Sequence, residues 1–125
     1  MTLSVLLVED SGVLRRSLRD LLHRLGGFRV VAELAAEAPA LQWLRAHARG
    51  WDLAVVDLVL EQGTGMAVIA ACKAQPVAGR VVVFSDYVTD EVRDYCLRLG
   101  ADAVFQKGRD GTALADYCGA LPRQA

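Results

Sequence analysis

The sequence has little of what marks a secreted or membrane-spanning protein. Its three cysteines are an odd number without a CxxC motif or metal-ligand spacing, which indicates reduced thiols. Its apolar runs reach about five to eight residues, far fewer than the roughly 18 that a membrane-spanning helix needs. The first residues carry no basic segment and no small-residue cleavage site, so a signal peptide is not predicted. We therefore expect a cytoplasmic protein with no membrane attachment.

The sequence also lacks an excess of charge of either sign. Lys and Arg number 14 against 15 Asp and Glu, a formal net charge of −1, which argues against direct nucleic-acid binding. Apolar residues make up 54% of the chain and charged residues 23%, a balance typical of globular proteins. The length of 125 residues fits a single domain, residues 1–125, and we place its core at about residues 3–121.

Short apolar runs alternate with stretches of helical periodicity. Strands are predicted at residues 5–8, 29–34, 53–56, 81–84 and 103–106, and helices at about 12–25, 38–48, 66–75, 89–99 and 110–121. Continuous runs rich in Val and Leu are typical of strands buried on both faces of a parallel sheet. The order strand–helix, repeated with short connections, predicts an α/β fold with a doubly wound parallel sheet.

Polar side chains stand where four of the predicted strands end. Glu9 and Asp10 follow the first strand, Asp57 the third, Ser85 the fourth and Lys107 the fifth. Functional groups of open α/β sheets lie beyond the carboxyl ends of the strands, so we expect these side chains to converge. Three neighbouring carboxylates repel one another unless a cation lies among them, and Mg²⁺ prefers such oxygen ligands. A carboxylate beside Mg²⁺ can act as a nucleophile toward phosphorus.

The same motifs resemble a known family. The segments VLLVEDS (5–11), VVDL (55–58), VFS (83–85) and GAD followed by Lys107 are similar to the receiver domains of two-component response regulators, including chemotaxis regulators. Each motif alone is weak, but their order and spacing over nearly the whole chain are specific. The resemblance implies a flavodoxin-like (βα)5 fold with a five-stranded parallel sheet in the order 2-1-3-4-5.

The resemblance also implies roles for the acidic residues. Asp57 would be the phosphoacceptor and a Mg²⁺ ligand, and Asp10 would bind the ion directly. Glu9 would bind it through water or alongside Asp10, and the backbone carbonyl of Val59 would complete the protein ligands.

The remaining roles concern the phosphoryl group and the partners. Ser85 would hydrogen-bond the phosphoryl group as a switch, and Lys107 would pair with its oxygens. The phosphodonor would be a phosphohistidine on a sensor histidine kinase or phosphotransfer protein, and the output would be binding of a downstream effector protein. The resemblance also allows a homodimer. Such a domain is regulatory and not an enzyme, because it catalyses only its own phosphoryl transfer and autodephosphorylation.

Four positions depart from the family pattern. Val104 stands where an aromatic switch residue is usual, Gly108 where proline is common, Asp86 where a small residue is usual, and Glu61 where proline is frequent. Phe105 should point to the opposite face from Val104, so it should not replace the missing ring, whereas Tyr87 could do so in part. The departures at Val104, Gly108 and Asp86 keep an alternative open, namely a pseudo-receiver that binds partners independently of phosphorylation.

Overall fold

The computed structural model describes residues 1–123. Gln124 and Ala125, the last two residues of the predicted domain, lie outside the described residues. Within residues 1–123, five strands alternate with five helices. Their bounds are β1 (Leu3–Val8), α1 (Gly12–Leu25), β2 (Phe28–Leu34), α2 (Glu37–Ala46), β3 (Leu53–Val56), α3 (Gly65–Lys73), β4 (Arg80–Ser85), α4 (Asp90–Leu99), β5 (Ala103–Gln106) and α5 (Gly111–Gly119).

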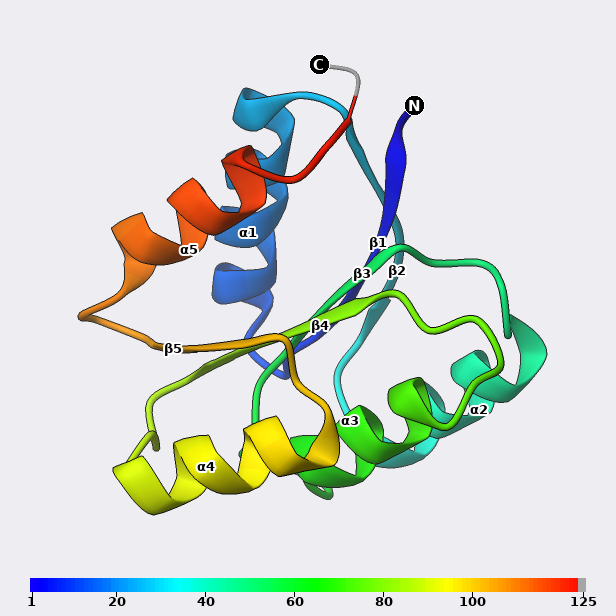
Figure 1. Ribbon diagram of the computed structural model, residues 1–125, viewed down its shortest axis with the longest axis vertical. Helices are drawn as coiled ribbons and strands as arrows, with labels where there is room; N and C mark the ends of the chain where they lie inside the picture. The colour runs from blue at the N-terminus through cyan, green and yellow to red at the C-terminus, as the bar shows by residue number, and fades with distance from the viewer. Residues whose placement is uncertain (124–125) are drawn as a thin grey trace.

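The strands form one parallel sheet in the order β2-β1-β3-β4-β5. Helices α1 and α5 cover one face of the sheet, and α2, α3 and α4 cover the other (Figure 1). The predicted doubly wound flavodoxin-like fold and its strand order are therefore confirmed. The order reverses direction at β1 and β3, so the crevice at their carboxyl ends is the expected place for a site.

The central strands owe their burial to apolar side chains on both faces. Along β1, Leu6 and Val8 pack beneath α2, α3 and α4, while Val5 and Leu7 pack beneath α1 and α5. Successive strand residues point to opposite faces, so one short run supplies both cores. This double burial makes β1 a rigid platform for the residues that follow Val8.

Four helices, α2, α3, α4 and α5, differ from their predicted bounds by one or two residues at one end or both. The largest differences are at carboxyl ends: α2 stops at Ala46, α3 at Lys73 and α5 at Gly119. In α3 the cause is local, because Pro76 disfavours a helical backbone at the residue before it, and Ala74 caps the helix instead. Helix ends fray, so periodicity alone does not fix the last turn.

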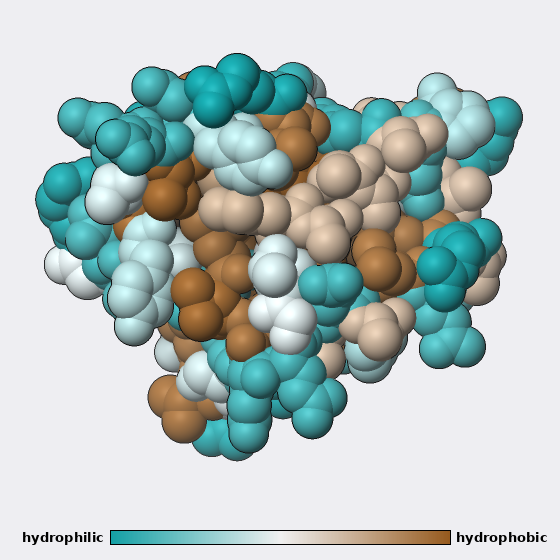
Figure 2. Space-filling model, turned by 90° about the horizontal axis from the view of Figure 1, so that it is seen from below, coloured by the Kyte–Doolittle hydropathy of each residue, from teal (hydrophilic) through white to brown (hydrophobic). Residues whose placement is uncertain are grey.

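The layer of α2, α3 and α4 keeps apolar groups at its surface. Figure 2 looks onto this layer and shows brown apolar groups across its middle, with teal polar groups gathered toward its edges. Within residues 1–123, no helix has both the length and the apolar character required to cross a membrane.

Candidate functional site

The ends of β1 and β3 bring three carboxylates together. Val8 and Val56 are register partners, and the Asp57 N–H donates to the Val8 carbonyl at 2.9 Å. The residues after these two valines therefore leave the sheet side by side. Glu9, Asp10 and Asp57 each offer a carboxylate oxygen, and these three atoms lie within 4.8 Å of one another. The predicted acidic residues are thus one cluster at the switch point of the sheet.

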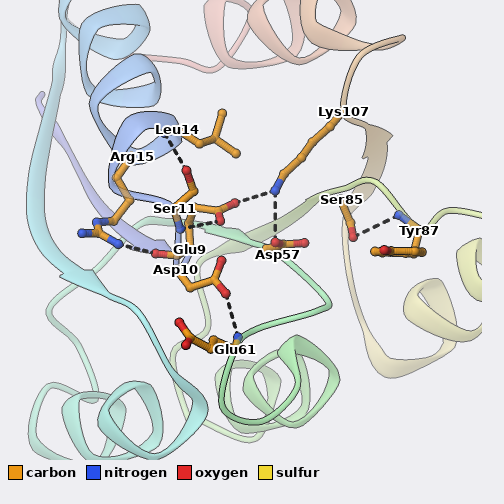
Figure 3. A network of polar contacts seen from close by, with 10 residues as sticks. All are labelled: Glu9, Asp10, Ser11, Leu14, Arg15, Asp57, Glu61, Ser85, Tyr87 and Lys107. Carbon is orange, nitrogen blue, oxygen red and sulfur yellow. Dashed lines mark hydrogen bonds and ion pairs between the residues drawn. The ribbon is translucent and has the colours of Figure 1, made fainter.

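Lys107 bridges two of these carboxylates. Its Nζ lies 2.7 Å from Glu9 Oε1 and 3.0 Å from Asp57 Oδ2, and its side chain reaches down between them (Figure 3). The Lys107 N–H donates to the Ser85 carbonyl at 2.9 Å, which fixes the start of the β5–α5 loop to the end of β4. Glu9 and Asp57 are only 3% and 6% exposed, so these ion pairs are shielded from bulk water.

Burial and pairing shift the ionisation of this cluster in a definite direction. Desolvation raises the pKa of Glu9, against the opposing effects of its hydrogen bonds to Lys107 and to the Ser11 N–H. For Lys107, burial disfavours the charged form, but hydrogen bonds to Glu9 and Asp57 outweigh it and raise the pKa. Lys107 is therefore an ammonium at neutral pH.

The cluster suits a divalent cation by its donor chemistry. Three carboxylates face one ammonium, so with every acid ionised two negative charges remain uncompensated. The donors are all oxygens, the ligand type that Mg²⁺ selects. Val59 follows Asp57 by two residues, and its backbone forms an antiparallel bridge with Thr64. The acidic residues present therefore fit Mg²⁺.

Ser85 ends β4, the strand next to β3. It is fully buried, and its Oγ accepts the Tyr87 N–H at 3.4 Å. Because Val56 pairs with Val83, Asp57 and Ser85 leave neighbouring strands at the same edge of the sheet. Ser85 thus lies at the site, but within residues 1–123 its hydroxyl is hydrogen-bonded to its own loop and not to an acid.

The remaining predicted residues surround this centre. Asp86 is exposed, and Tyr87, 65% exposed, lines an apolar hollow of about 330 Å³ between the β3–α3 loop and α4. Val104 is buried in the core beneath α4, whereas Phe105 packs on the other face with its ring 5.8 Å from that of Tyr117. Phe105 therefore does not occupy the face of the missing aromatic.

The structure adds contacts that sequence reasoning missed. Arg15 Nη1 donates to the Glu9 carbonyl at 2.7 Å, and the Glu61 N–H donates to Asp10 Oδ2 at 2.7 Å. A proline at position 61 would have no N–H to donate. Both contacts use backbone atoms, so neither residue type gave a signal. Gly108 has a φ of +79°, and no cis peptide bond occurs within residues 1–123, so the bond between Lys107 and Gly108 is trans.

Comparisons with known proteins agree with this geometry. The response regulator receiver domain family matches residues 5–118. The DNA-binding transcriptional activator DevR/DosR of Mycobacterium tuberculosis is 32% identical over 111 residues, which are 89% of this chain and 50% of that protein. The photosynthetic apparatus regulatory protein RegA of Rhodobacter capsulatus is 27% identical over 113 residues, or 90% and 59% of the two chains. The chain thus spans about half the length of these curated relatives.

Solved structures show the same relationship. A LuxR-family two-component response regulator from Aurantimonas sp. superimposes with a TM-score of 0.82 at 26% identity, covering 93% of this chain and 81% of that one. A response regulator from Burkholderia pseudomallei, solved with a phosphorylated aspartic acid and a calcium ion, gives a TM-score of 0.73 at 25% identity over 89% and 63% of the two chains. The fold, the strand-end acids and these matches together place the chain in the family of response regulator receiver domains of two-component signalling.

Proposed function

We propose that Asp57 accepts a phosphoryl group from a phosphohistidine of a sensor histidine kinase or phosphotransfer protein, in a reaction that requires Mg²⁺. The observation that carries this proposal is the convergence of Glu9, Asp10 and Asp57 at one sheet edge, with Lys107 paired to two of them. The ion pairs of Lys107 involve only Glu9 and Asp57, so they do not explain why Asp10 lies in the same cluster. A bound cation does explain it, because it would offset the repulsion among three carboxylates.

Each step has a residue to carry it. A carboxylate oxygen of Asp57 attacks phosphorus while the P–N bond of the phosphohistidine breaks, and the leaving imidazole nitrogen keeps the electron pair and takes up a proton. Lys107 exchanges its contact with the Asp57 carboxylate for one with a phosphoryl oxygen. The Ser85 hydroxyl gives up the Tyr87 N–H and donates to another phosphoryl oxygen.

The cation would be held by this chain's own oxygens. Glu9, Asp10, Asp57 and the backbone carbonyl of Val59 are the candidate ligands, with Glu9 bound directly or through water. When bound, Mg²⁺ supplies the positive charge that offsets repulsion between the acids and the incoming phosphoryl oxygens.

The output would be a change in protein binding. Movement of Ser85 toward the phosphoryl group pulls on Tyr87 and the start of α4, which biases a two-state equilibrium of that surface. The partner would be an effector protein, or a second copy of the chain through α4 and α5, where Tyr95 is 43% exposed. The matched relatives named as transcriptional regulators are about twice as long, so any DNA-binding step would lie outside the matched receiver region.

Acetyl phosphate labelling tests the proposal. The wild-type protein should gain one phosphoryl group by intact-mass spectrometry in Mg²⁺, and peptide mapping should place it on Asp57. Asp57→Asn, or wild type in EDTA, should show no label. Labelling that persists in Asp57→Asn, or that needs no divalent ion, would contradict it.

The pseudo-receiver alternative is less well supported, because the acids and Lys107 are all in place. It rests on Val104, Gly108 and Asp86 alone. Beryllofluoride separates the two functions: a receiver that switches binds it with Mg²⁺ and shifts amide resonances in α4 and β5. Binding without those shifts would favour a phosphoacceptor that does not switch.

A further inference from the structure

The loop between β3 and α3 is anchored on two sides. On the side of the site, the Glu61 N–H donates to Asp10 Oδ2 at 2.7 Å. On the other side, Glu37 Oε1 accepts the Thr64 N–H at 2.9 Å, and the Glu37 N–H donates to the Gln62 carbonyl at 3.1 Å. Glu37 is the first residue of α2, an element that takes no other part in the site. The loop is therefore tied both to a candidate metal ligand and to a helix outside the acidic cluster.

Gly63 allows Glu37 to lie this close. Its φ is +93°, a backbone conformation that L side chains rarely adopt. A Cβ at this position would overlap the Glu37 Cβ and lie 2.8 Å from Glu37 Oε1. Glu37 therefore packs against the loop only because position 63 has no side chain.

Hydrogen bonds between the two ends of the β3–α3 loop couple the position of Thr64 to the residues near the site. Val59 and Thr64 form an antiparallel bridge, and the Gly65 N–H donates to the Leu58 carbonyl at 2.9 Å. A displacement of Thr64 therefore displaces Val59, whose carbonyl is a candidate ligand. It also displaces Glu61, whose N–H orients Asp10.

We propose that Glu37 is a positioning residue for the cation site. It holds the β3–α3 loop so that Val59 and Asp10 present their oxygens together with Asp57. This inference rests on the proposed function, because it assigns Glu37 to the same Mg²⁺ site. Hydrogen-bonded groups behind metal ligands commonly tune affinity in this way.

Calorimetric titration of Mg²⁺ into three variants tests the assignment. Glu37→Ala removes the acceptor and should weaken Mg²⁺ binding by roughly threefold to tenfold, the effect of losing one hydrogen bond of ordinary strength. Glu37→Gln keeps an acceptor oxygen and should stay within about twofold of wild type. Glu91→Ala is the matched control, because Glu91 is an exposed acid in the first turn of α4 and removing it changes the net charge equally.

A second readout uses the protein without metal. In Glu37→Ala the amide hydrogens of Glu61 and Thr64 should exchange roughly threefold to tenfold faster, while amides of β1 and β3 stay protected. A purely structural role would lower the midpoint of urea unfolding but leave the Mg²⁺ affinity of the folded protein unchanged.

Two results would overturn the inference. One is an unchanged Mg²⁺ affinity in Glu37→Ala; the other is an equal loss in Glu37→Gln, which would assign the effect to charge and not to anchoring. Failure of the proposed function is distinguishable, because then wild type itself would not bind Mg²⁺.

Discussion

At the scale of single residues, the site holds more negative charge than its own cation can balance. Lys107 is shared by Glu9 and Asp57, while Asp10 has only the Glu61 N–H as a hydrogen-bond partner within residues 1–123. Buried carboxylates in this state cost folding free energy until a cation arrives. The site is thus built for binding at the expense of stability.

Glu9→Gln should expose that cost. Gln keeps an oxygen for Lys107 Nζ but removes the buried charge, so the metal-free protein should gain on the order of 1 kcal/mol at pH 7. Burial raises the pKa of Glu9 in the folded state above its ordinary value of 4.5, so the folded state binds the proton more tightly than the unfolded state does. Protonation of Glu9 therefore stabilises the folded protein fully below pH 4.5, and this stabilisation is lost as pH rises through the folded-state pKa. Urea unfolding at several pH values should show the advantage of Glu9→Gln growing from acid toward neutral pH.

Saturating Mg²⁺ provides the control for this comparison. Ligand binding stabilises only the folded state that holds the site, so wild type should gain more from Mg²⁺ than Glu9→Gln does. An advantage of the variant that is independent of both pH and Mg²⁺ would refute the charge argument.

Asp86→Ala should raise the rate of labelling by acetyl phosphate about twofold to fivefold at low salt, because an exposed carboxylate beside the site repels the anionic donor. The difference should shrink as salt is added. Asp94→Ala, an exposed acid on α4, serves as the control and should label at the wild-type rate. Identical rates for Asp86→Ala and wild type would show that Asp86 does not act on the donor.

The convergence of the acids, Ser85 and Lys107 could be predicted from sequence because each lies at or just beyond the carboxyl end of a strand. The contacts of Arg15, Glu61 and Glu37 could not. They join a backbone atom of one segment to another segment distant in sequence or out of periodic register, and hydrophobic periodicity carries no information about such pairs.

At the scale of elements, α3 begins unusually close to the end of β3. Gly65, its first residue, has no room for a side chain: a Cβ would overlap the Asp57 carbonyl and lie 2.9 Å from a Val56 methyl. The position of Asp57 therefore depends on a glycine in the next element.

Gly65→Ala should destabilise the protein by about 2–4 kcal/mol, because either the helix start or the Asp57 backbone must shift. Chemical denaturation measures the loss. Gly111→Ala is the matched control, since Gly111 also begins a helix but a Cβ there meets nothing within 4 Å, so a change within about 1 kcal/mol is expected. Equal stabilities of the two variants would contradict the close approach.

Element type and order followed from the sequence because the buried strands are unbroken apolar runs and the helices have caps. Ser11 caps α1 and Thr89 caps α4 through their side chains, and Gly100 ends α4 at a φ of +111°. The carboxyl ends of α2, α3 and α5 were wrong by two residues. None of these three helices has a left-handed glycine at its end to mark the boundary.

At the scale of the whole molecule, Arg123 joins the ends of two helices on one face of the sheet. Its guanidinium donates to the carbonyls of Leu25, Gly26, Gly119 and Leu121 at 2.6–3.1 Å and lies 4.8 Å from the centroid of the Phe28 ring. This contact closes α5 onto α1 at the edge of the sheet opposite the acids. That residues 1–125 make one domain remains a prediction.

Arg123→Ala should lower the unfolding free energy by about 1–3 kcal/mol, because three partly buried carbonyls and one exposed carbonyl lose their donor. Arg24→Ala is the control, since Arg24 is exposed in the last turn of α1 and should change stability by less than about 0.5 kcal/mol. Thermal unfolding compares them. Equal midpoints would show that Arg123 does not hold the helices together.

The most direct test of the account is calorimetric titration of Mg²⁺ into the wild-type protein and into Asp10→Asn and Asp57→Asn. The account predicts one bound ion per chain in wild type and at least about tenfold weaker binding in each variant, because each loses a charged ligand. No binding by wild type, or equal binding by all three proteins, would contradict it.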